Sequence, residues 1–424
     1  MPVHRLLYSQ LGYLVFPMVL LRLFWRSLSN PFIRRNWQQR LGFINLKPSP
    51  RIWLHAVSVG ETIAATPLVE SLLLNYPHHK LLISNTTATG YKTTTRLFGN
   101  RVEQCYIPYD INACVSTFLS RSNPCLLIIM ETEIWPNLLH QCKSHRVPML
   151  IANARLSERS TIRYLKILPL IKSSLNQVDK IACRSDTDVE NFMRLGAATK
   201  QLETIRNIKF DVLPSHEKIN VNVLKQQLGN HRKIWVAAST HKGEDELILS
   251  CFSQLKATHR NLVLVLVPRH PERFEIVFDR CKQTHYTIQR RSNGRPFTKD
   301  CDIILGDSMG EMPNWYACAD VVFLGGSLVN TGGHNPLEAT VYGVPVVSGP
   351  FIFNFHDVYA VLCKAEVAWI KPDLKTLTKK LNELLAMPES DLMTLRVRAK
   401  QTLKNNKGAT KKILKMTHDL INTH

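Results

Sequence analysis

The first 50 residues of the chain contain no Asp or Glu, and the whole chain lacks several motifs that mark common enzyme classes. The ten cysteines are scattered from Cys105 to Cys363 without a CxxC pair, which argues against a disulfide framework and against a cysteine-based zinc site. HExxH is absent, so no metal centre is expected. The absence of GxxxxGKS/T and GxGxxG disfavours a P-loop enzyme and a dinucleotide-binding fold.

Composition sets broad limits on the fold and the partners. A chain of 424 residues is long enough for two or three domains, and an apolar fraction of 45% excludes disorder as its main property. Lys and Arg number 54 against 33 Asp and Glu, which gives a formal net charge of +21. Such an excess indicates an anionic partner: nucleic acid, an anionic membrane surface or a phosphorylated substrate.

The N-terminal 50 residues combine positive charge with an apolar run. Sixteen uncharged residues separate Arg5 from Arg22, which is marginal for a helix that spans a membrane. No small-x-small cleavage site follows, so a secretory signal fits poorly. Two alternatives stay open, a single spanning anchor and a helix that lies in the membrane interface. The basic residues of this segment are Arg5, Arg22, Arg26, Arg34, Arg35, Arg40 and Lys47.

These basic residues also bear on orientation and partner. Because Arg22, Arg26, Arg34 and Arg35 follow the apolar run, the positive-inside rule leaves the rest of the chain in the cytoplasm. Their place beside an apolar segment, rather than on a recognisable RNA- or DNA-binding motif, favours an anionic membrane and disfavours nucleic acid. We therefore expect residues 1–50 to form a membrane anchor with a basic interfacial segment.

From residue 51 onward, short apolar runs alternate with helix-length amphipathic segments. This rhythm is typical of a doubly wound parallel α/β sheet. Expected helices cover residues 62–75, 111–121 and 157–176. Expected strands cover residues 52–57, 81–84, 125–130, 148–151, 180–183, 234–238, 262–267, 286–289, 302–305, 321–324 and 344–347.

The polar stretch 212–232 interrupts the alternation. We therefore predict two Rossmann-like α/β domains, residues 51–212 and residues 213–424, with two terminal helices over residues 372–416 in the second domain. In such sheets ligands bind outside the carboxyl ends of the strands, in a cleft between the two domains. Candidate functional residues are therefore those that follow each expected strand.

Three segments of the first domain carry candidate residues. Glu61 opens the helix after strand 52–57, where it either complements the helix dipole or acts as a general base on an acceptor hydroxyl. Glu131 and Glu133 follow strand 125–130; one of them caps the next helix, while the other pairs with a base such as Arg155, as a structural salt bridge or as part of a site. Lys209 lies beside the presumed cleft.

The second domain offers a candidate anion site. Arg269 follows strand 262–267, where a guanidinium can bind a phosphate with two parallel bonds or simply be an exposed turn residue. Strand 321–324 leads into two glycine pairs, then Asn335 at an expected N-cap and Pro336 at the first helical position, which predicts a phosphate-accepting helix start. Glu338, one turn later, could hold the two hydroxyls of a ribose. The basic run 289–295 is expected to be a solvated loop.

Together these segments resemble a known enzyme family. HAVSVGE at 55–61, TTATGY at 86–91, METEIWPN at 130–137 and NARLSERS at 153–160 resemble the first half of the bacterial transferases of Kdo (3-deoxy-D-manno-octulosonic acid). STHKGE at 239–244, VPRHPERF at 267–274, GDSMGEM at 306–312 and GGSLVNTGGHNPLEA at 325–339 resemble the second half, in the same order.

The resemblance implies a GT-B glycosyltransferase, with an acceptor-binding N-terminal domain and a donor-binding C-terminal domain. It implies CMP-Kdo as donor and a phosphorylated lipid A precursor as acceptor, with inversion of the anomeric centre and without a metal or other cofactor. It places the enzyme at the bacterial inner membrane, with its catalytic domains on the cytoplasmic face. Another GT-B transferase, which uses a UDP-sugar and a lipid-linked acceptor, is the alternative.

Roles for individual residues follow from the same resemblance. Glu61 would be the catalytic base, and Glu131 and Lys209 would stabilise the transition state. One departure concerns Lys209, because Arg206 stands where the family usually has glycine. The residues implied to bind CMP are Pro268, Arg269, Met309, Gly310, Glu311, Asn335, Pro336, Leu337 and Glu338.

Overall fold

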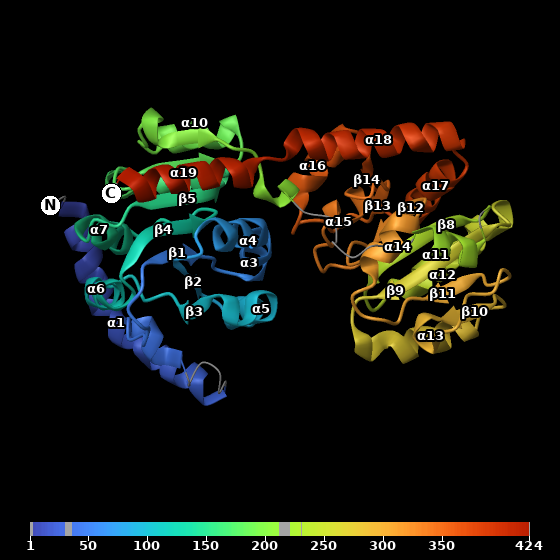
Figure 1. Ribbon diagram of the computed structural model, residues 1–424, viewed down its shortest axis with the longest axis horizontal. Coiled ribbons are helices and arrows are strands. Elements are labelled where there is room, and N and C mark those ends of the chain that lie inside the picture. Colours follow the sequence, from blue (N-terminus) through green and yellow to red (C-terminus); the bar gives the residue numbers. More distant parts are fainter. Residues whose placement is uncertain (1–2, 30–35, 212–220, 230, 424) are drawn as a thin grey trace. The chain divides into compact units, whose positions relative to one another are not determined.

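The computed structural model describes residues 3–29, 36–211, 221–229 and 231–423. The chain divides into two compact units, which we call the N-terminal unit (residues 1–211 and 407–424) and the C-terminal unit (residues 212–406). Figure 1 shows that each unit is a sheet covered by helices. Arg34, Arg35 and residues 212–220 of the expected linker lie outside the described residues.

The sheet of the N-terminal unit has seven strands in the order β3-β2-β1-β4-β5-β6-β7, and every neighbouring pair is parallel. The central strands are buried on both faces, as expected for a sheet with helices on either side. The strands are β1 Arg51–His55, β2 Lys80–Asn85, β3 Glu103–Tyr106, β4 Pro124–Met130, β5 Met149–Ala154, β6 Lys180–Cys183 and β7 Leu202–Thr204.

Alternate residues of these strands build two cores. Trp53 of β1 packs with Phe118 on one face, while Ile52 and Leu54 pack with Leu68 on the other. The helices of this unit are α1 Val3–Ser29, η1 Trp37–Leu41, α3 Val59–Ala64, α4 Thr66–Asn75, α5 Ala88–Phe98, η2 Gly99–Arg101, α6 Asn112–Ser122, α7 Pro136–Ser144, α8 Glu158–Leu165, α9 Leu168–Leu175, α10 Asp186–Arg194, η3 Thr199–Gln201, η4 Ile208–Asp211 and α19 Ala409–Thr423.

The last of these helices differs from the sequence-based expectation. Residues 407–424, expected in the second domain, belong to the N-terminal unit, where Ile413 and Met416 of α19 join the core that contains Ile52 and Leu54. The Asp211 carboxylate caps the helix, because it accepts hydrogen bonds from the backbone N–H groups of Gly408 and Thr410, both within 2.7 Å. Three helices rather than two therefore follow residue 372.

The sheet of the C-terminal unit also has seven parallel strands, in the order β10-β11-β9-β8-β12-β13-β14. Its strands are β8 Lys233–Thr240, β9 Leu262–Pro268, β10 Ile288–Arg290, β11 Ile303–Leu305, β12 Val321–Leu324, β13 Val346–Ser348 and β14 Ala368–Ile370. Its helices are α11 Val221–Leu228, α12 Asp245–Thr258, η5 Pro271–Arg273, α13 Phe274–Lys282, η6 Arg291–Asn293, α14 Met312–Cys318, α15 Leu337–Thr340, α16 His356–Lys364, α17 Leu374–Leu385 and α18 Glu389–Asn406.

The expected fold of two Rossmann-like α/β units is confirmed, and the differences concern its details. The expected helices 62–75 and 157–176 are each split, because Pro67 and Pro169 lack the N–H that would continue a helix and instead lie in the first turns of α4 and α9. The strands missing from the expected set are β3, β7 and β14, which are short strands at the sheet edges.

Helix α1 packs along the N-terminal unit through one of its faces (Figure 1). The Tyr8 hydroxyl donates to Asp110 Oδ2 at 2.9 Å, and the Ser9 hydroxyl donates to Asn137 Oδ1 at 2.5 Å. Further along the helix, the ring of Phe16 meets that of Tyr109 edge-on. These contacts recur at the spacing of a single helix face and fix the first half of α1 to the domain.

The opposite face of α1 is apolar and exposed. The helix is long and apolar enough from Val3 to Trp25 to cross a membrane, by length and composition. Its exposed large apolar side chains are Val3, Leu6, Leu7, Leu11, Leu14, Val15, Met18, Leu21, Phe24, Trp25 and Leu28. An exposed apolar surface of this kind is typical of a protein or membrane contact.

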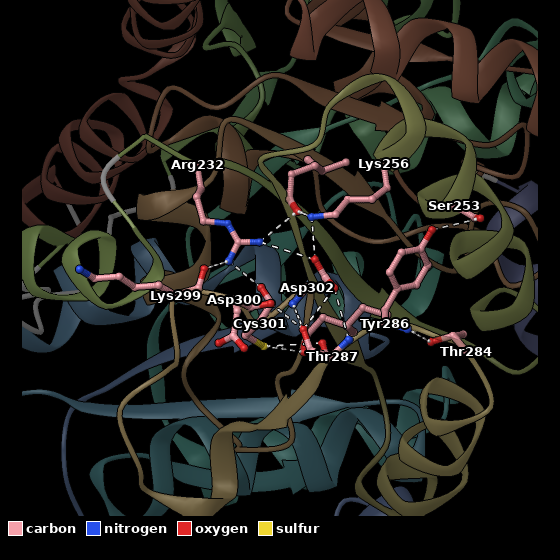
Figure 2. A network of polar contacts seen from close by, with 12 residues as sticks. Arg232, Ser253, Lys256, Thr284, Tyr286, Thr287, Lys299, Asp300, Cys301 and Asp302 are labelled. Atoms are coloured by element: carbon pink, nitrogen blue, oxygen red, sulfur yellow. Dashed lines mark hydrogen bonds and ion pairs between the residues drawn. The ribbon is translucent and has the colours of Figure 1, made fainter.

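A polar network in the C-terminal unit ties together the amino ends of its strands (Figure 2). Asp302 forms an ion pair with Lys256 at 2.7 Å, and Arg232 donates to the carbonyls of Lys299 and Cys301 at 2.9 and 2.6 Å. Burial raises the pKa of Asp302, but the hydrogen bonds from Lys256 and Thr287 outweigh burial and hold that pKa below its usual value. This network lies at the edge opposite the carboxyl ends of the strands and is structural.

We expect Asp302→Ala to lower the free energy of unfolding by about 2 kcal/mol, because the variant leaves two largely buried cations without their carboxylate. The contribution of Asp302 is present above the usual pKa of an aspartate and is lost as the pH falls below it. Urea unfolding at pH 7 measures the effect. The matched control is Asp279→Ala, which removes an exposed pair with Lys282; an equal loss in both variants would contradict the role of the network.

Candidate functional site

The strand order of each sheet creates a switch point at its carboxyl edge. In the N-terminal unit the chain proceeds outward from β1 to β3 on one side and from β4 to β7 on the other. The loops after β1 and β4 therefore diverge, which is where doubly wound sheets bind ligands. The corresponding loops of the C-terminal unit follow β8 and β12. Glu61 and Glu131 lie after β1 and β4.

The Glu61 side chain is half-buried and folds back over the start of α3. Its Oε2 accepts the backbone N–H of Val57 at 2.7 Å, and its Oε1 accepts the Ser58 hydroxyl at 3.3 Å. These two contacts bind the Glu61 carboxylate to the loop that precedes α3. Burial, opposed by the Val57 hydrogen bond and reinforced by the charges of Glu131 and Glu133, raises the pKa of Glu61 to about 7.

Three carboxylates therefore share one electrostatic environment at this switch point. Glu131 raises the pKa of Glu61 and that of Glu133, for which burial is the larger cause. Glu131 has a positive φ of 58°, a left-handed conformation that is uncommon for a residue with a side chain. Backbone strain and clustered like charges both cost stability, and such features concentrate at functional sites.

The segment TTATGY packs directly beneath the Glu61 loop. The backbone N–H groups of Thr86 and Thr87 both donate to the Val57 carbonyl at 3.2 Å, and a Cβ added at Gly90 would lie 3.2 Å from that same oxygen. Only glycine permits this close approach of α5 to the loop. The motif therefore supports the backbone that carries Glu61.

The loop after β4 differs from expectation in its ion pairing. Glu133 Oε2 accepts the indole N–H of Trp135 at 2.5 Å, and the Thr132 hydroxyl bridges the carbonyl and the N–H of Arg155 at 2.5 and 3.0 Å. Within the described part of the chain, the exposed Arg155 side chain forms no ion pair with a carboxylate. Arg155 therefore contributes its backbone, which joins the loops after β4 and β5.

Lys209 lies on η4, a turn that two hydrogen bonds to asparagine side chains hold in place. The N–H of Ile208 donates to Asn153 Oδ1 at 3.0 Å, and the N–H of Lys209 donates to Asn207 Oδ1 at 3.1 Å. Because Asn153 belongs to β5, the neighbour of β4, this bond brings the Lys209 turn back toward the Glu131 loop. Sequence reasoning missed Asn153, although it stands in the quoted motif NARLSERS.

Arg206 begins this turn in a left-handed conformation, with φ of 74°. Glycine adopts such a conformation without strain, which explains why a glycine is expected there. The turn is thus formed in this chain despite the substitution, and the half-buried Lys209 keeps its place on η4.

In the C-terminal unit, a buried carboxylate organises the first glycine pair. Glu244 accepts the backbone N–H groups of Gly326, Ser327 and Leu328 at 2.7, 3.1 and 2.9 Å, and also that of His241 at 2.8 Å. These N–H groups form an anion-binding concavity of the kind that binds phosphate elsewhere. Here Glu244 fills it, so the first glycine pair holds the loop rather than a ligand. The sequence analysis did not single out Glu244.

The helix expected to begin at Pro336, with Asn335 as its N-cap, begins one residue later, with Pro336 at the N-cap position. Helix α15 spans only Leu337–Thr340, and the side chain of Asn335 already accepts the Leu337 N–H at 3.1 Å. Burial raises the pKa of the Glu338 carboxyl group, and the positive charge of Arg269 opposes that shift. Arg269 and Glu338 thus lie close together, with Tyr316 buried beside them.

Three histidines adjoin Arg269. His241 Nε2 and His334 Nε2 are 2.9 Å apart, and the ring of His270 meets that of His241 edge-on. Burial, Arg269 and the neighbouring histidines lower the pKa of His334 to about 3, so this group is neutral at physiological pH. The sequence analysis did not select any of these histidines.

The basic run 289–295 is not the solvated loop expected from the sequence. Arg290 pairs with Asp307 at 2.6 Å and Arg291 pairs with Glu311 at 2.8 Å, so both arginines support the loop that contains Met309, Gly310 and Glu311. Residues 306–310 also read Gly-x-Ser-x-Gly, the spacing of a hydrolase nucleophile elbow. The Ser308 hydroxyl, however, donates to the Glu311 carboxylate rather than to an imidazole.

No group of three or more His, Cys, Asp or Glu side chains that could hold a metal ion occurs among the residues that the structure describes.

Comparison with known proteins decides which family has this arrangement. Residues 35–212 match the family model of 3-deoxy-D-manno-octulosonic-acid transferase (kdotransferase). The 3-deoxy-D-manno-octulosonic acid transferase of Haemophilus influenzae is 37% identical over 415 residues, which cover 97% of each chain. The chain belongs to the Kdo transferase family. The transferase of Bordetella pertussis is 36% identical over 349 residues, or 80% of each chain.

Solved structures confirm the fold of this Kdo transferase. A glycosyltransferase from Rickettsia africae matches with a TM-score of 0.54 and 12% identity, over 89% of this chain and all of that one. The UDP-GlcNAc 2-epimerase of Neisseria meningitidis matches with a TM-score of 0.56 and 11% identity, over 87% of this chain. The enzyme is therefore a glycosyltransferase with the GT-B fold of two Rossmann-like units.

We expect Glu131→Gln to lower the pKa of Glu61, because the neutral amide removes a negative charge that disfavours ionisation of Glu61. NMR titration of labelled glutamate carboxyl groups measures this shift. Glu70→Gln is the control, since Glu70 pairs with Arg101 on the exposed side of α4. A Glu61 pKa that is unchanged by Glu131→Gln would show that the two carboxylates do not interact.

Proposed function

We propose that this enzyme transfers Kdo from CMP-Kdo to the phosphorylated lipid A precursor, with inversion, on the cytoplasmic face of the bacterial inner membrane. Membership of the Kdo transferase family supports the sugar that is transferred. The observation that carries the mechanism is the half-buried Glu61 carboxylate, whose pKa of about 7 suits a base that works near neutral pH.

In this mechanism an acceptor hydroxyl attacks the anomeric carbon of Kdo while Glu61 takes up the hydroxyl proton. The new bond between sugar and acceptor forms as the bond between the anomeric carbon and the phosphate oxygen of CMP breaks. The Val57 N–H and the Ser58 hydroxyl orient the carboxylate. Glu131 and Lys209 stabilise the charge that develops during transfer, one as an anion beside the oxocarbenium-like sugar and the other as a cation.

The departing CMP carries negative charge, which the C-terminal unit neutralises. We assign this role to Arg269 at the end of β9, without a metal ion. Glu338, adjacent to Arg269, accepts hydrogen bonds from the ribose hydroxyls. Pro268, Met309, Gly310, Glu311, Asn335, Pro336 and Leu337 complete the CMP site in this proposal.

We further propose that α1 lies in the membrane interface instead of spanning it. The contacts of Tyr8, Ser9 and Phe16 with the domain occupy its first half. Residues 17–29 then remain, about 13 residues against the roughly 20 that a spanning helix needs. The exposed apolar face would enter the lipid, while the acid-free basic segment meets anionic headgroups.

Glu61→Gln should abolish transfer, because the amide cannot accept the hydroxyl proton, while CMP binding stays intact. For the unaltered enzyme, the rate should rise with pH through about 7, since burial raises the pKa of Glu61 and only the deprotonated base is active. Mass spectrometry of the lipid product from CMP-Kdo and lipid A precursor measures both effects.

Glu70→Gln, on an exposed part of the same unit, is the control for this experiment and should transfer Kdo at the normal rate. Near-normal turnover by Glu61→Gln would reject the base assignment. Transfer from a UDP-sugar, with none from CMP-Kdo, would reject the proposed donor.

Leu14→Glu with Met18→Glu should reduce sedimentation of the protein with phosphatidylglycerol vesicles at least tenfold, because both side chains lie on the exposed apolar face of α1. Leu74→Glu, an equally exposed position on α4, is the matched control and should bind like the unaltered protein. In sealed inverted membrane vesicles, protease should remove an N-terminal tag; protection of that tag would show that α1 spans the membrane.

A further inference from the structure

Two arginines at the end of β10 and the start of η6 support the loop after β11. Arg290, at the end of β10, donates to Asp307 Oδ2 at 2.6 Å and to Glu275 Oε2 at 2.9 Å. The backbone N–H and the hydroxyl of Ser292 donate to the same Asp307 carboxylate at 2.8 and 2.7 Å. The first half of the loop is therefore fixed at Asp307, whose side chain is fully buried.

The second half of the loop is fixed at Glu311. Arg291 Nε lies 3.1 and 3.0 Å from the two carboxylate oxygens, and Arg291 Nη2 lies 2.8 Å from Oε1. The Ser308 hydroxyl donates to Oε2. A carboxylate offers about four lone-pair positions, so these contacts use most of its capacity to accept hydrogen bonds. The Glu311 side chain is only 23% exposed.

The residues between these two anchors are open to solvent. The Met309 side chain is 67% exposed. Gly310 has a positive φ of 84°, and a Cβ added there would meet no atom within 4 Å. The backbone of Met309 and Gly310 is thus free to meet a ligand, whereas the Glu311 carboxylate is committed to Arg291 and Ser308.

We propose that Arg291 is a positioning residue of the nucleotide site, which anchors Glu311 so that the loop recognises the pyrimidine nucleotide through the main chain of Met309 and Gly310. The proposal rests on the proposed function, which places CMP at residues 309–311. In this proposal the Glu311 carboxylate holds the loop in place, and Glu338 is the carboxylate that contacts the nucleotide.

A double-mutant cycle tests the proposal, with CMP as ligand and calorimetry of the full-length enzyme in detergent. If Glu311 acts only through Arg291, then Arg291→Ala, Glu311→Ala and the double variant should each weaken CMP binding by the same factor, about tenfold. Arg398→Ala is the matched control, because it breaks an exposed pair with Glu366 in the same unit, and it should bind CMP normally. Arg269→Ala is the positive control for weakened binding.

A second measurement separates positioning from a general loss of structure. At saturating CMP-Kdo, Arg291→Ala should keep kcat within twofold while KM for the donor rises, and Arg291→Lys should recover part of the affinity. If Glu311→Ala weakens CMP binding severalfold further in the Arg291→Ala background, Glu311 acts on the nucleotide site other than through Arg291 and the proposal is wrong. Failure of the unaltered enzyme to bind CMP would overturn the proposed function together with this inference.

Discussion

The divergence of the chain at β1 and β4 is the constraint on which the candidate site of the N-terminal unit depends. Strand β1 leads to its neighbours on one side of the sheet, while β4 begins the series on the other side. The loops that carry Glu61 and Glu131 therefore lead away from each other at the carboxyl edge, which is where doubly wound sheets bind ligands. The second sheet repeats this geometry at β8 and β12, where Glu244 joins the two loops.

Several residues at or near these two switch points have backbone conformations that destabilise the fold. Glu131, Asn153, Arg206 and Ser239 all adopt left-handed backbone conformations, and each lies at the end of a strand or at the start of the Lys209 turn. Such conformations cost of order 1 kcal/mol each and persist only where the surrounding structure enforces them. The close-packed cores of the two sheets, whose central strands are buried almost throughout, hold the backbone in these conformations.

The sequence predicts the sheets well because long apolar runs have one stable environment in a doubly wound fold. Strand 321–324 agrees residue for residue with β12, and strand 180–183 with β6. The short edge strands β3, β7 and β14 escape prediction, since their pattern of buried and exposed residues is brief and weak.

The same contrast applies to the site. Glu61, Glu131 and Arg269 could be selected because each follows a recognisable strand. The ion pair of Arg291 with Glu311 joins the segments that follow two adjacent strands, β10 and β11, whose pairing cannot be deduced from local pattern. A run of arginines therefore resembles a solvated loop until its carboxylate partners are known. Glu244 was missed for a similar reason, because its partners are backbone N–H groups more than 80 positions away.

Helix α19 has a consequence for the order in which the molecule can be assembled on the ribosome. It supplies Ile413, Met416 and Leu420 to the core of the N-terminal unit, yet the whole C-terminal unit is synthesised before it. Until then one face of the first sheet lacks part of its cover, and Asp211 has no helix to cap. Nascent chains should therefore complete their second unit while the first still exposes an apolar groove, which reverses the usual sequence of domain maturation from the N-terminus.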